Sequence, residues 1–128
     1  MPSATQDNTS LLLSKLYREG AGNVESVLSG TAVTISPPST ATTTVLTLNG
    51  TTPAITLPAP TQGAAKTLVL VQDATGSRIP SWVATSGAIK WVGAAAPTLQ
   101  TAAAAVDAVD FKSFDGINWY GSAKLHIA

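Results

Sequence analysis

From residue 24 onward, turn-forming residues divide the chain into short segments at intervals of roughly 8–12 positions. In Thr43–Leu48, for example, Leu46 and Leu48 fall on one face of an extended chain and Thr47 falls on the other. The segments are rich in Thr and Val, whose β-branched side chains suit pleated strands. The pattern predicts an all-β fold, a β-sandwich or jelly roll of about eight to ten strands.

One expected strand is apolar on both faces, over Leu68, Val69, Leu70 and Val71, which predicts a central strand or one with its second face covered. Asp115 and Gly116 predict a tight hairpin turn. No internal repeat of roughly 20–50 residues is visible. The full set of expected strands is Val24–Leu28, Thr31–Ile35, Thr43–Leu48, Ala54–Leu57, Lys66–Gln72, Arg78–Ala84, Ala88–Val92, Val106–Phe114, Ile117–Tyr120 and Lys124–Ile127.

The N-terminal part of the chain has a different pattern. Residues 1–7 are expected to form an extended arm and Asn8–Glu19 a short helix, ended by Gly20 and Gly22. At about three turns this helix is marginal alone in water, so it must dock on the β-domain or on another subunit. We therefore divide the chain into residues 1–22, an arm and helix for attachment, and residues 23–128, a β-sandwich domain. The apolar helix face that could close the chain's own core or attach it to a partner consists of Leu12, Leu13, Leu16 and Tyr17.

The charge balance argues against two classes of partner. Seven Lys and Arg residues balance seven Asp and Glu residues, so there is no basic surplus for nucleic acid or for a membrane surface. Charged residues make up only 11% of the chain while apolar residues reach 45%, which suggests that partner subunits cover much of the surface. The N-terminus lacks the basic and apolar regions of a signal peptide, so we expect synthesis in a cytoplasm.

The residues that usually carry catalysis are scarce. There is no Cys, and His126 is the only histidine, so neither a zinc site nor a serine hydrolase triad is expected. Asp107 and Asp110 would point to opposite faces of a strand and would not converge as paired carboxylates. We therefore expect no enzyme activity, no metal and no cofactor.

The aromatic residues leave three possibilities open. Trp91 and Trp119 could pack across the core, one or more aromatic residues could anchor a subunit contact, or an exposed ring could stack on a sugar. The candidate subunit interface consists of Leu68, Val69, Leu70, Val71, Trp82, Trp91, Trp119 and Tyr120.

An ordered series of short motifs runs from Thr43 to Ser122. Val45–Gly50 and Ala54–Pro58 are followed by Leu68–Arg78, which contains the turn sequence QDATGSR, and by Ile89–Trp91. Ala96–Leu99, Ala105–Asp107 and Phe114–Gly121, which contains DGINWYG, complete the series. In this order the motifs resemble a domain that recurs in the virion proteins of tailed bacteriophages. Ile79–Trp82 departs from the pattern, because Pro80 interrupts the strand expected there.

The resemblance implies a homotrimeric protein of tail fibres, tail tips or capsid decoration. A single domain behind a short anchor fits best a capsid decoration (cement) or head-fibre subunit on the virion surface, with the major capsid protein as its partner. A tail-fibre tip that binds a host surface glycan is one alternative, and a low-copy adaptor at the head–tail joint or tail is another.

Overall fold

The computed structural model describes residues 23–125 and residue 127. Within that range the chain forms nine β-strands, which agrees with the number expected from the sequence. The predicted arm, helix and attachment residues Leu12, Leu13, Leu16 and Tyr17 lie outside the described residues, as does His126. The strands are β1 (Val24–Leu28), β2 (Ala32–Thr34), β3 (Thr43–Leu48), β4 (Ala54–Leu57), β5 (Ala64–Gln72), β6 (Ser81–Ala84), β7 (Ile89–Trp91), β8 (Val106–Ser113) and β9 (Trp119–Lys124).

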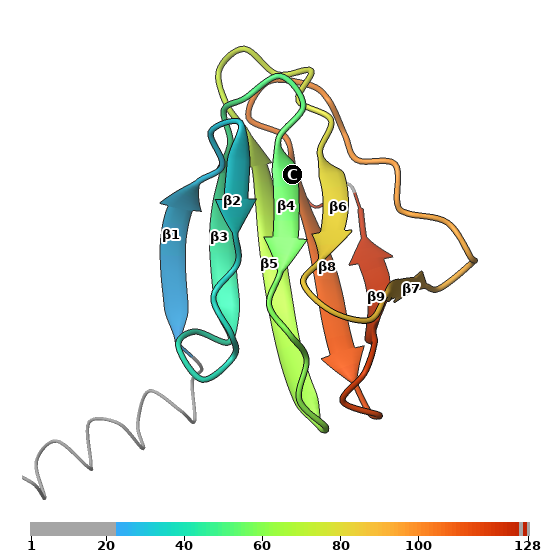
Figure 1. Cartoon of the computed structure of the whole chain (residues 1–128). Helices are drawn as coiled ribbons and strands as arrows, with labels where there is room; N and C mark the ends of the chain where they lie inside the picture. The colour runs from blue at the N-terminus through green and yellow to red at the C-terminus, as the bar shows by residue number, and fades with distance from the viewer. Residues whose placement is uncertain (1–22, 126, 128) are drawn as a thin grey trace, which may run out of the picture.

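The strands form two sheets that face each other (Figure 1). The larger sheet has six strands in the order β1-β3-β5-β8-β9-β7, and the smaller has three in the order β2-β4-β6. From β1 to β7 the chain alternates between the two sheets, so that each of β1 to β4 pairs with the strand two places further along. The chain therefore winds between the sheets and adds one strand to each sheet on every circuit.

Most strand pairs are parallel, because the chain returns to each sheet in the same direction after crossing the other. Val24 lies beside Thr43, and Thr43 lies beside Thr67. The pairs β2–β4, β4–β6 and β7–β9 are also parallel, and only β5–β8 and β8–β9 are antiparallel. The all-β class is confirmed. Because most of the pairs are parallel, the strands do not have the antiparallel connectivity of a jelly roll.

The turns of successive circuits stack on one another. Asn49, which follows β3, accepts a hydrogen bond through its side-chain oxygen from the backbone N–H of Gly30, 2.6 Å away, in the turn after β1. The backbone N–H of Asn49 donates to the Ser29 hydroxyl at 3.1 Å. A Cβ atom placed on Gly50 would lie 2.1 Å from the Gly30 carbonyl oxygen, so only glycine fits there.

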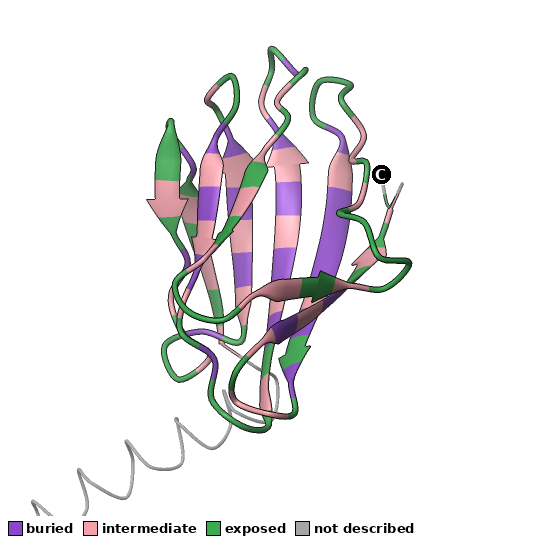
Figure 2. Cartoon of the chain, turned by 45° about the vertical axis from the view of Figure 1, so that its right-hand side comes forward, coloured by how far each residue is buried: buried purple, intermediate pink, exposed green. Residues whose placement is uncertain are grey.

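The core lies between the two sheets and receives alternate residues of β3, β4 and β5, as the burial colours in Figure 2 show. β5 lies at the centre of the six-stranded sheet, which agrees with its apolar sequence. Its two faces are nevertheless distinct, because Leu68 and Leu70 are buried while Val69 and Val71 are only partly covered. The fully enclosed apolar side chains are Ile35, Leu46, Leu48, Ile55, Leu57, Leu68, Leu70, Val109, Phe111 and Trp119.

The last hairpin differs from its predicted bounds. Asp115 and Gly116 do form the turn between β8 and β9, but β9 begins at Trp119 rather than at Ile117. The Asp115 side-chain oxygen accepts hydrogen bonds from the backbone N–H groups of Ile117 and Asn118, at 2.9 and 3.0 Å. Because the turn uses these two donors, pairing starts two residues later than the sequence pattern predicts.

Candidate interaction surfaces

The side of the six-stranded sheet that faces away from the core carries no charge over its first three strands. Cross-strand register places outward side chains in rows such as Leu28–Thr47–Val71 and Ser26–Val45–Val69. We call this surface the outer face. Natural sheets that face water usually carry polar or charged residues at such positions. The outer face consists of Val24, Ser26, Leu28, Thr43, Val45, Thr47, Ala65, Thr67, Val69 and Val71.

The charged residues of the same side lie beyond β5. Asp110 on β8 accepts a hydrogen bond from the Thr67 hydroxyl at 2.8 Å and forms an ion pair with Lys124 of β9 at 3.7 Å. Lys112 lies opposite Tyr120 in the β8–β9 register. The ion pair is exposed and contributes little to stability. The ion pair marks the boundary of the outer face toward β8. At the opposite boundary, along β1, the outer face carries no charged side chain.

The predicted subunit interface divides between the core and the surface. The structure corrects the prediction for Leu68, Leu70 and Trp119, because these side chains are at most 2% exposed and pack inside their own chain. The alternation of a strand explains the error, since only every second residue of β5 faces outward. Val69 and Val71 lie on the outer face and remain candidates for contact with a neighbour.

The large aromatic rings form one cluster within the chain. Trp82 and Trp91 meet edge to face with ring centres 5.2 Å apart, and Phe111 packs on both of them, at 5.7 and 5.5 Å. The Trp91 ring lies against Gly121, where a Cβ atom would be only 2.6 Å from it. Trp82 and Trp91 are partly buried, so the core role proposed for Trp91 and Trp119 agrees with their positions.

Tyr120 belongs to a separate surface cluster. Its hydroxyl donates to Asp115 at 2.7 Å, and its ring stacks on Phe114 with centres 4.1 Å apart. Hydrogen bonds from the backbone N–H groups of Asn118 and Ile117, together with the Tyr120 hydroxyl, hold the pKa of Asp115 far below its ordinary value. Asp115 thus acts as a turn-forming residue, and Phe114 remains exposed beside it.

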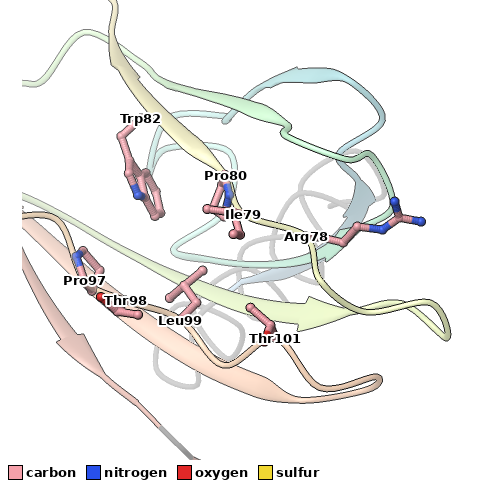
Figure 3. Close-up of a pocket in the computed structure, with 8 residues that line it drawn as sticks. All are labelled: Arg78, Ile79, Pro80, Trp82, Pro97, Thr98, Leu99 and Thr101. Atoms are coloured by element: carbon pink, nitrogen blue, oxygen red, sulfur yellow. The ribbon is translucent and has the colours of Figure 1, made fainter.

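A small pocket opens between the β5–β6 connection and the loop after β7 (Figure 3). Its volume is about 160 Å³. Trp82 and Pro80 line one side and Pro97 and Leu99 the other, while the Arg78 guanidinium points away from Trp82. Arg78 instead pairs with Asp73 at 2.9 Å. The sequence pattern singled out Trp82 but did not indicate that Pro80 and Pro97 lie across from each other.

A buried polar network lies near the start of β5. Lys66 is only 2% exposed, and its ammonium group donates to the Ala41 carbonyl and to the Ser36 hydroxyl. Ser36 donates in turn to Glu25, which also accepts from Thr44 at 3.0 Å. Burial lowers the pKa of Lys66, and the hydrogen bond from Ser36 is the main cause of the lowered pKa of Glu25. The network links β1, β3 and β5 with the loop after β2, and no sequence motif predicted it.

The acidic residues considered for catalysis do not converge. Asp107 lies opposite Leu70 on the core side and accepts from the Gln100 backbone N–H at 2.8 Å, whereas Asp110 lies opposite Thr67 on the outer side. This confirms the prediction that they point to opposite faces. Residues 23–125 and 127 contain no group of three or more His, Cys, Asp or Glu side chains placed to hold a metal ion. Nor does this part of the chain contain a helix long and apolar enough to cross a bilayer.

No known protein family, curated protein or solved structure was found to match the chain. What it does must therefore be argued from its own surfaces.

Proposed function

We propose that the protein is a structural virion subunit that trimerises and binds the outside of a bacteriophage capsid shell, which it stabilises as a decoration or cement protein. The observation that carries the proposal is the outer face, an uncharged sheet surface in a chain that contains few charges altogether. Six of its ten side chains are apolar and none is charged, and exposed apolar patches mark contacts with other chains. The motif series from Thr43 to Ser122 supports the choice of a phage virion.

In this proposal the free energy of association comes from the burial of apolar surface rather than from a chemical reaction. Covering apolar area contributes about 25 cal/mol per Å² before the costs of association are subtracted. A homotrimer has closed symmetry, so it caps a shell without growing into a fibre. Many such contacts over a shell would resist the internal pressure of a packaged genome. Residues 1–22 would attach the trimer to the major capsid protein.

Two variants test the role of the outer face. Val69→Lys places a charge in its middle without entering the core, and Val69→Thr keeps the branched shape without the charge. We expect Val69→Lys to fold but to lose trimers in analytical ultracentrifugation and occupancy on capsids by cryo-electron microscopy, while Val69→Thr retains both. Normal trimers and full capsid occupancy for the folded Val69→Lys variant would refute the proposal.

Deleting residues 1–20 tests the attachment segment separately. The proposal expects a folded trimer that no longer binds capsids. Full decoration by the shortened chain would remove the attachment role from Leu12, Leu13, Leu16 and Tyr17. Counting subunits per virion separates decoration, which needs hundreds of copies, from a head–tail or tail adaptor, which would need about a dozen or fewer.

The pocket beside Trp82 favours a second candidate function, a receptor-binding tip. Trp82 and Pro80 form an apolar wall on one side of the pocket and Pro97 lies opposite, an arrangement in which an aromatic ring could stack on a sugar ring. At about 160 Å³ the pocket is smaller than most ligand sites, which argues for a contact with one ring only. Trp82→Ala would also disturb the aromatic cluster, so Ile79→Lys at the exposed rim is the cleaner variant. Saturable glycan-array binding that this variant abolishes would favour the receptor-binding function.

A further inference from the structure

We infer that β1 is a self-association edge, at which a second copy of the chain adds its own β1 antiparallel to the first and extends the six-stranded sheet across a two-fold axis. β1 is the first strand of that sheet and, among the described residues, pairs only with β3. The inference concerns a different contact from the trimer proposed above and does not depend on it.

Within residues 23–125 and 127, the backbone of β1 presents a regular set of groups that pair with no other strand. The Thr43 N–H donates to the Asn23 carbonyl and the Ser29 N–H donates to the Thr47 carbonyl, so odd-numbered residues direct their backbone groups toward β3. Because these directions alternate along a strand, the N–H and C=O groups of Val24, Ser26 and Leu28 point toward the open edge. These three residues are therefore the ones available to pair with a new strand.

The edge lacks most of the features that normally prevent such pairing. Edge strands are usually protected by lysine, proline, a bulge or an inward-pointing charge that is costly to bury. β1 contains none of the first three, and its only charge, Glu25, points inward to hydrogen bonds from Ser36 and Thr44. Val24 and Leu28 are each 65% exposed on the outer face. The strand thus offers both unpaired backbone and uncovered apolar side chains.

The sequence of β1 is complementary to itself in one antiparallel register. Pairing centred on Ser26 places Val24 opposite Leu28 of the second copy and Glu25 opposite Val27, so no two like charges face each other. In this register each residue whose backbone groups point to the open edge lies opposite another such residue, so that each copy contributes three backbone N–H donors. A two-fold axis through Ser26 closes the pair and turns both outer faces to the same side. A second copy therefore fits the edge better than an unrelated strand.

Proline at position 26 tests the edge with little effect on the fold. Ser26→Pro removes an N–H that points to the open edge and leaves the pairing with β3 complete, while Ser26→Ala keeps that N–H. By sedimentation equilibrium we expect Ser26→Pro to weaken the two-fold association roughly 10- to 100-fold and Ser26→Ala to leave it unchanged. An unaltered melting temperature confirms the fold. Equal association of both variants would refute the inference.

A charge pair tests the register. Val24→Lys and Leu28→Glu should each weaken association, and the double variant should restore it, because the new lysine of one copy would then lie opposite the new glutamate of the other. An unrelated partner strand would give no such rescue, so a double variant no better than the single ones overturns the inference. A third outcome would also overturn the inference. The wild-type chain would form no two-fold contacts, yet the amides of Val24, Ser26 and Leu28 would resist hydrogen exchange, because the chain's own preceding residues occupy the edge.

The two proposals fail in different ways. If the two-fold contact alone is wrong, Ser26→Pro and the wild-type chain give the same trimers. If the trimer alone is wrong, the wild-type chain forms dimers that Ser26→Pro abolishes. A chain that uses both contacts would form larger species that Ser26→Pro reduces to trimers.

Discussion

The indole N–H of Trp119 donates a hydrogen bond to the carbonyl oxygen of Pro58 over 2.7 Å. Trp119 begins β9 of the larger sheet, and Pro58 directly follows β4 of the smaller one. The bond therefore joins the two sheets through a ring that is only 1% exposed. It is a polar link at a position surrounded by the apolar side chains of the core.

Trp119→Phe tests this link. Phenylalanine fills part of the space but leaves the Pro58 carbonyl without its donor, so we expect a loss of about 2–4 kcal/mol in the free energy of unfolding. Urea denaturation followed by circular dichroism measures it. Ile117→Val, at an exposed position, is the control and should change the value by less than about 0.5 kcal/mol. Equal stability of both variants would show that the link contributes nothing.

The stacked turns predict a strong effect at Gly50. In Gly50→Ala the new methyl group would meet the Gly30 carbonyl oxygen, so the two turns must separate. We expect a loss of about 2–4 kcal/mol, read as a lower melting temperature. Gly63→Ala is a matched control, because that position has a φ of +83° but open space around it. It should cost only about 1 kcal/mol, and a larger loss at Gly63 than at Gly50 would contradict the stacking.

Replacement of Lys66 by methionine tests the buried network. Methionine retains much of the side-chain volume but removes the donor to the buried Ala41 carbonyl and to Ser36. We expect Lys66→Met to lose about 1–3 kcal/mol in chemical denaturation at neutral pH. The exposed Lys112→Met is its control and should lie within about 0.5 kcal/mol of the wild type.

Lys66 also predicts a pH dependence. Burial lowers its pKa in the folded state, so at alkaline pH the folded chain releases this proton before the unfolded chain does. The unfolded state then binds more protons, and the free energy of unfolding rises with pH between the folded pKa and the unfolded value near 10.4. The wild type should therefore gain stability relative to Lys66→Met as pH rises through this range. A constant difference between them would contradict the lowered pKa.

At acidic pH the free energy of unfolding is expected to fall as the pH is lowered. The pKa values of Glu25, Asp73 and Asp115 are all lowered in the folded state, by hydrogen bonds from Ser36, from Arg78 and from the Asn118 backbone N–H respectively. Their stabilising effect is present above the unfolded pKa values near 4 and is lost as pH falls through the folded ones. Acid titration of the melting temperature should show this loss, and Asp115→Asn should make the curve shallower. A curve as steep as that of the wild type would exclude Asp115 as a contributor.

The sequence predicted the strands well and their arrangement poorly. Alternation along Thr43–Leu48 and the turn at Asp115 identify elements, because side-chain direction and turn chemistry are local properties. Whether Val24 pairs with Thr43 in the same sheet is not local, and without a repeated motif nothing in the sequence indicates that the chain winds between two sheets. For the same reason the sequence placed Leu68 and Leu70 at a subunit interface, since an apolar strand does not reveal which of its faces packs against its own chain.

The winding path also constrains how this protein can vary in length. Every circuit adds one strand to each sheet, as β1 and β2 do, so removal of β1 alone would leave β2 at the end of one sheet with nothing matching it in the other. Natural lengthening or shortening at this end should therefore occur by whole circuits, each of which adds or removes one strand of each sheet.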